Sequence, residues 1–98
     1  MRLGILMRSA THAAHALGLS RAALRAGHEV ALFVMDEGVR TLGELAPLAS
    51  MDGVDVAYCD FSLMQQDVSP ANVPDGFHAS SQLDNAKMAS LSDRVVVL

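Results

Sequence analysis

Cys59 is the only cysteine in the chain, and it closes the segment VDVAYC over residues 54–59, which is apolar except for Asp55. The run predicts a strand, and residues 60–66 that follow it predict a short helix. Open α/β sheets place their chemistry at the carboxyl ends of the strands, and the start of a helix stabilises a thiolate. The pattern therefore indicates thiol chemistry at Cys59. The alternative is a structural cysteine that packs as a small hydrophobic side chain.

A single cysteine narrows the thiol chemistry to a few types. It excludes a C-x-x-C dithiol and a disulfide within the chain. It still allows a persulfide, a mixed disulfide with a partner, or a response to oxidation. One cysteine without a signal-peptide pattern is typical of a reducing compartment, so we expect the protein to be cytoplasmic.

Other residues that could form a metal site, a phosphate-binding loop or a hydrolase site have less support in the sequence. His12 and His15 are three residues apart and would share a helix face, but His28 and His78 are isolated and complete no metal site. Glycine-rich phosphate loops and the G-x-S-x-G pattern of hydrolases are absent. The chain also has few aromatic residues to stack on a flavin. We therefore predict no metal and no cofactor.

Apolar runs between polar segments predict the remaining strands. We expect them at residues 2–7, 28–35 and 93–98. The run at 28–35 lacks alternation, which is typical of a strand covered on both faces. The run at 93–98 is similar, which indicates a central strand or a subunit contact.

Helices are expected between these strands. We predict them over residues 12–26, over 60–66 and from Ser80 or Ser81 to about Leu91, the last one following a surface loop at 68–76. Thr41 and Glu44 have the spacing of a capping box for one more helix, which Pro47 is expected to break. The alternation predicts one α/β domain over residues 1–98, flavodoxin-like and doubly wound, with a mostly parallel sheet of four to five strands.

This fold would bring a polar loop close to the thiol. In a flavodoxin-like order the first and third strands are neighbours, so the loop after the first strand would face Cys59. Its candidates for stabilising the thiolate are Arg8, Ser9, Thr11 and His12. The alternative is that the loop only caps the first helix.

Composition excludes two classes of partner. The net charge is −4 and the basic residues are scattered, so we expect no nucleic acid as a ligand. No apolar run is long enough to span a membrane. Because 51 % of this short chain is apolar, we expect part of its surface to be covered in a homo-oligomer.

Four ordered segments resemble the DsrE/DsrF-like family of small sulfur-relay proteins, which includes the TusBCD subunits. They are residues 22–33 (AALRAGHEVALF), 36–39 (DEGV), 53–59 (GVDVAYC) and 91–96 (LSDRVV). The resemblance implies a flavodoxin-like subunit that assembles into trimers or hexamers. It also implies that Cys59 carries a persulfide sulfur between donor and acceptor proteins, as a sulfur carrier or sulfurtransferase.

The segment after Cys59 departs from the family pattern. Active members often have small residues and then Arg-Gly in the next helix, whereas this chain has Asp60 and Asp67 and no Arg or Lys between Arg40 and Lys87. Nearby carboxylates disfavour a thiolate. Two hypotheses therefore stand: a sulfur carrier that uses Cys59, or a non-catalytic oligomeric member that binds a partner or small ligand, with Cys59 structural.

Overall fold

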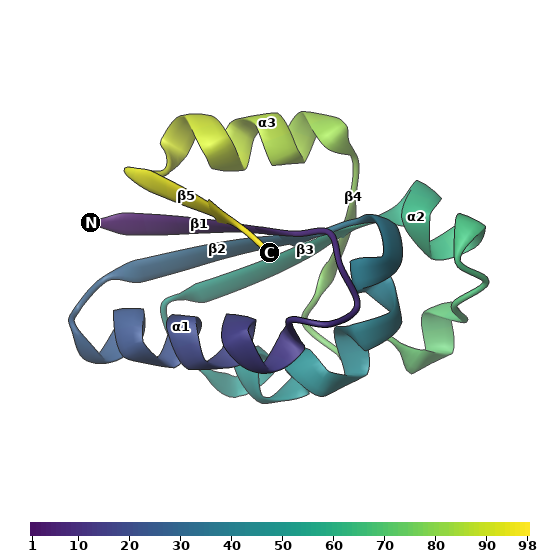
Figure 1. The fold of residues 1–98 in the computed structure, drawn as a ribbon, viewed down its shortest axis with the longest axis horizontal. Coiled ribbons are helices and arrows are strands. Elements are labelled where there is room, and N and C mark those ends of the chain that lie inside the picture. Colours follow the sequence, from purple (N-terminus) through teal and green to yellow (C-terminus); the bar gives the residue numbers. More distant parts are fainter.

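A five-stranded parallel sheet runs through the computed structural model, which describes residues 1–98 (Figure 1). Its strands are β1 (Arg2–Met7), β2 (Glu29–Val34), β3 (Val54–Cys59), β4 (His78–Ser80) and β5 (Arg94–Val97). They lie in the order β4-β3-β2-β1-β5, and each neighbouring pair is parallel. The predicted fold class is confirmed: the chain is an α/β domain consistent with a flavodoxin-like fold.

Helices cover both faces of this sheet, as a doubly wound domain requires (Figure 1). The α-helix α1 (Ala13–Arg25) and the 3-10 helix η1 (Asp36–Ser50) lie on one face, and α3 (Gln82–Leu91) lies on the other. The short helices α2 (Asp60–Gln65) and η2 (Pro70–Asn72) follow the carboxyl end of β3. None of these helices combines the length and the apolar character needed to cross a membrane.

Two expectations about neighbours in the sheet are wrong. β2 lies between β1 and β3, because its Val34 pairs with Met7 on one side and with Tyr58 on the other. Successive crossovers have laid the first four strands side by side in chain order, and only β5 returns to the other side of β1. β5 is therefore an edge strand, so of the two alternatives expected for it, a central position or a subunit contact, the central position is wrong; its Val97 is 61 % exposed.

The two faces carry apolar cores of different size. Sixteen buried residues form the core between the sheet and α1 with η1, whereas Ala31, Phe33, Cys59 and Met88 form a separate core of four under α3. Successive side chains of β2 alternate between these cores, with Leu32 in the larger one and Phe33 in the smaller one. This explains why the β2 sequence is continuously apolar.

The segment η1 differs from the predicted capped helix. Its buried apolar residues are three apart, at Val39, Leu42, Leu45 and Leu48. A repeat of three matches the three residues per turn of a 3-10 helix, which aligns these side chains in one row. Thr41 is therefore no N-cap: it is buried inside the segment, and its hydroxyl donates to the Gly38 carbonyl at 2.8 Å.

A glycine allows α3 to lie close to the sheet. A Cβ at Gly4 would lie 2.5 Å from Met88 Sδ and 2.6 Å from Ser92 Oγ, so α3 sits directly over β1. The helix packs mainly on β1 and β2. The same face of β3 and β4 is more open, and its Asp55 and His78 form an exposed ion pair at 3.2 Å.

Candidate functional site

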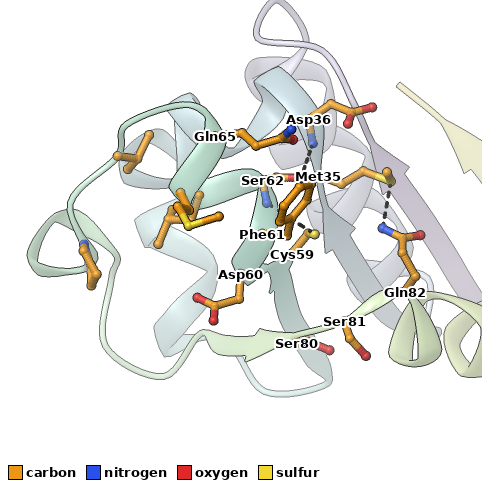
Figure 2. A pocket seen from close by; sticks show the side chains of 14 residues that line it. Met35, Asp36, Cys59, Asp60, Phe61, Ser62, Gln65, Ser80, Ser81 and Gln82 are labelled. Atoms are coloured by element: carbon orange, nitrogen blue, oxygen red, sulfur yellow. Dashed lines mark hydrogen bonds between the residues drawn. The ribbon is translucent and has the colours of Figure 1, made fainter.

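A cavity of about 1080 Å³ opens at the carboxyl end of β3, next to α2 and the start of α3 (Figure 2). Its apolar walls come from Met35, Phe61, Leu63, Met64, Val68 and Pro70, and Cys59 lines it together with Asp36, Asp60, Ser62, Gln65, Ser80, Ser81 and Gln82. The cavity thus lies at the sheet edge where open α/β folds bind ligands. Cys59 is the only thiol that can react there.

Cys59 joins β3 to α2 without an intervening loop. It is the N-cap residue of α2, and its Sγ accepts a hydrogen bond from the Ser62 backbone N–H at 3.5 Å. The sulfur thus occupies the place that a hydroxyl or carboxylate oxygen takes in an ordinary cap. The side chain is 5 % exposed and packs with Phe33 and Met88.

Ser62 links α2 to the start of η1. Its buried hydroxyl accepts a hydrogen bond from the Asp36 backbone N–H at 2.9 Å. Asp36 has φ of +52°, a left-handed conformation that is uncommon outside glycine. Ser62 therefore holds the wall of the cavity in this conformation. Sequence reasoning missed Ser62, although its place three residues after an N-cap is where capping contacts are made.

Arg8 reaches this network from the far side of Asp36. Its Nε donates to Asp36 Oδ2 at 3.0 Å, and its backbone N–H donates to the Leu98 carbonyl at 2.7 Å. Arg8 is therefore connected to Cys59 through Asp36 and Ser62 but does not touch the sulfur. Both members of the ion pair are exposed, so its contribution to stability is at most about 1 kcal/mol.

The other candidates from the first loop lie away from the cavity. Ser9 Oγ bonds to Thr11 Oγ1 at 3.3 Å, and His12 Nδ1 lies 3.0 Å from His15 Nδ1. None of these residues lines the cavity, because β2 separates the loop from β3. The argument that placed this loop against Cys59 is therefore wrong. No three His, Cys, Asp or Glu side chains lie together as metal ligands.

Asp60 gives the cavity its uncompensated charge. Arg8 neutralises Asp36, whereas Asp60 takes part in no ion pair. No Lys, Arg or His lines the cavity. Asp67, the other carboxylate that the sequence placed behind the thiol, is exposed and lies outside the lining. Of these two aspartates, only Asp60 lines the cavity.

β4 brings Ser80, which the sequence offered only as a possible helix cap, to the lining of the cavity. Ser80 pairs with Cys59 in the sheet, and its hydroxyl donates to the Asp84 carboxylate on α3. This bond is the main cause that lowers the pKa of Asp84 below its ordinary 3.8, with smaller effects of Lys87 and the Ser81 backbone in the same direction. Of the two serines predicted as the cap of the last helix, Ser80 and Ser81, it is Ser81 that caps α3, because its Oγ accepts a hydrogen bond from the Leu83 N–H at 3.3 Å.

Comparisons with known proteins give a likeness at the level of fold. No family model matches the sequence, and no curated protein matches it. The structure is similar to the crystal structure of the ychN protein from E. coli, with a TM-score of 0.75 and 13 % identity over 100 % of both chains. The ychN protein has a DsrE-like fold. The likeness therefore supports the DsrE-like resemblance as a matter of fold.

Proposed function

We propose that this protein is a DsrE-like sulfur carrier of the cytoplasm, in which Cys59 relays persulfide sulfur between partner proteins. The observation that carries the proposal is the position of Cys59: the residue is among those that line a large cavity at the carboxyl end of β3, and its sulfur accepts a hydrogen bond from the Ser62 N–H at 3.5 Å. The DsrE-like fold of its structural neighbour supports the same assignment.

The transfer takes two displacements. In the first, the Cys59 thiolate attacks the outer sulfur of a donor persulfide, an S–S bond forms on Cys59, and the donor leaves as its thiolate. In the second, an acceptor thiolate attacks the outer sulfur on Cys59, and Cys59 leaves as the thiolate. Each step forms one S–S bond and breaks one, so no external oxidant or reductant is needed. The Ser62 N–H supports the proposal because it would stabilise Cys59 as the leaving group.

Exposed apolar side chains support partner binding at the mouth of the cavity. Phe61 is 60 % exposed and Met64 is 70 % exposed, and both line the cavity that holds Cys59. A donor or acceptor protein would cover them when its own thiol enters. Leu91 of α3 and Val97 of β5 are also exposed, and we assign this second apolar surface to a homo-oligomer, a trimer or hexamer.

A mass measurement tests the sulfur-carrier function. Incubation with cysteine persulfide should add the mass of one sulfur atom, about 32 Da, to the native protein. The Cys59→Ser variant should gain nothing, and its circular dichroism should show that it is folded. An equal mass gain in the parent protein and in the variant would contradict the role of Cys59.

The burial of Cys59 favours a second candidate. Its side chain belongs to the small apolar core with Phe33 and Met88, which is the environment of a structural cysteine. In this case the protein is a non-catalytic oligomer that binds a partner or a small ligand in the cavity. Iodoacetamide would then label Cys59 only after unfolding, whereas a sulfur carrier is labelled in its native state.

A further inference from the structure

Building on the proposed function, we infer that the cavity admits positively charged thiols and persulfides and rejects anionic ones, and that Asp60 sets this preference. The substrate class is a sulfur atom with a cationic group beside it, either on a partner protein or on a small molecule. Nothing in the two-displacement chemistry requires such a preference. It follows from the charges around Cys59.

The charged side chains that line the cavity are all acidic. Two carboxylates line it, and no cationic side chain does. Asp36 bonds to Arg8 Nε at 3.0 Å, while Asp60 has no cationic partner. In the view of Figure 2 the two carboxylates lie on opposite sides of Cys59. A substrate that enters therefore meets the negative charge of Asp60 and no positive charge within the lining.

Asp60 is exposed, so solvent and salt screen its charge in part, and the apolar walls reduce that screening on the side of the cavity. Six of the lining residues are apolar, and the amide of Gln82 is turned to Met35, with Nε2 3.6 Å from Sδ. Charges interact more strongly next to apolar walls than in bulk water. An anion that enters loses hydration without gaining a counter-charge, whereas a cation gains the attraction of Asp60. The expected order of reactivity is cationic, then neutral, then anionic.

The size and exposure of the cavity favour a partner protein as the carrier of the cationic thiol. A volume of about 1080 Å³ exceeds the space that one cysteine side chain fills. Phe61 and Met64 stay exposed beside it and offer apolar contacts to a longer segment. The matching segment would present a cysteine with Lys or Arg and apolar neighbours, since these complement Asp60 and the two exposed side chains.

Two methanethiosulfonates of opposite charge test the preference without sulfur-relay chemistry. One carries a trimethylammonium group and the other a sulfonate. In both, the Cys59 thiolate attacks the sulfenyl sulfur, a mixed disulfide forms, and methanesulfinate leaves. Each rate is divided by the rate with 2-mercaptoethanol at the same pH, which removes the intrinsic difference between the reagents. The corrected ratio of cationic to anionic rate should be about fivefold or more in the native protein.

Matched variants assign the effect to Asp60. Asp60→Asn should bring the corrected ratio close to one. Asp67→Asn is the control, because it removes an exposed carboxylate outside the cavity at a position with φ of +55°, a conformation that asparagine also adopts. This control should retain the native ratio. High salt should reduce the ratio in the native protein.

Peptides distinguish the two sources of a cationic thiol. Two cysteine peptides, one flanked by lysines and one by glutamates, are activated as mixed disulfides with the same leaving thiol. Faster exchange with the lysine peptide supports a protein partner, and a preference limited to the small reagents assigns a small cationic thiol. A corrected ratio of one or less, an unchanged ratio in Asp60→Asn, or no labelling of the native protein by either small reagent would overturn the inference.

The persulfide mass assay separates this inference from the proposed function. A protein that prefers cationic reagents but gains no sulfur has the charged cavity without the relay. A protein that gains sulfur but shows no charge preference has the relay without the selection by Asp60.

Discussion

The two faces of the sheet differ in how well they are covered. The face under α1 and η1 holds sixteen buried apolar residues, and the face under α3 holds four. Cys59 belongs to the smaller core, while its strand neighbour Tyr58 belongs to the larger one. Two neighbouring residues of β3 therefore lie on opposite faces of the sheet, one inside the main core and the other at the cavity.

Because of this difference in cover, one face of the sheet provides most of the stability of the fold and the other face holds the candidate site. The larger core buries most of the apolar surface and sets most of the hydrophobic stabilisation. The smaller core contains Cys59 together with Phe33 and Met88, and the same residue lines the cavity. A thinly covered sheet face can thus hold a residue that lines a cavity without disturbing the main core.

The largest expected effect is the loss of a side chain from the larger core. Leu45→Ala removes a fully buried residue from the row of η1 and should lower the free energy of unfolding by about 2–5 kcal/mol. Met88→Ala in the smaller core should cost less, about 2 kcal/mol, because its site opens more readily to solvent. Urea denaturation measures both. If the two losses are equal, the faces do not differ in their contribution to stability.

A smaller effect is expected where α3 approaches the sheet. Gly4→Ala places a methyl group 2.5 Å from Met88 Sδ and 2.6 Å from Ser92 Oγ, so these side chains must move, alone or together with α3, at a cost of about 1–3 kcal/mol. Gly43→Ala is the matched control, because nothing lies within 4 Å of its added Cβ. The movement at Gly4 should also raise the rate at which iodoacetamide labels Cys59. An unchanged labelling rate together with lost stability would show that α3 does not control access to the thiol.

The smallest expected effect concerns pH on the open side of the α3 face. The pKa of Asp84 is lowered in the folded protein, chiefly by the Ser80 hydroxyl. The carboxylate therefore contributes stability above its ordinary pKa of 3.8, and this contribution is lost as the pH falls through the lower, folded pKa. In Ser80→Ala, an NMR titration should move the pKa of Asp84 upward. Ser90→Ala, an exposed serine on the same helix, should leave it in place.

Much of the fold could be predicted from local patterns. The strand at residues 2–7 and the step from the strand ending at Cys59 into a helix match β1, β3 and α2. β4 was missed because it has only three residues, two of them exposed, and it is held by backbone pairing with β3. η1 was misread because its row of apolar residues repeats every three residues, whereas an α-helix repeats every 3.6.

The candidate site was predictable only in part, for a physical reason. Cys59 could be placed at a strand end because strand and helix patterns are local. Its neighbours depend on the order of the strands in the sheet. This order follows from how the crossover connections pack, so no single segment of the sequence predicts it. The network from Arg8 through Asp36 to Ser62 joins three separate elements, so only the assembled fold reveals it.

The position of β1 between β2 and β5 also has a consequence for how the protein is made. β1 is synthesised first, yet its second neighbour comes from residues 94–97. A growing chain on the ribosome therefore holds an unpaired edge of β1 until nearly all other elements have emerged. Arg8 gains its bond to the Leu98 carbonyl only at that stage. The last residues of the sheet thus complete the pairing of β1 and the contacts of Arg8, whereas the residues that line the cavity, up to Gln82, have already been made by then.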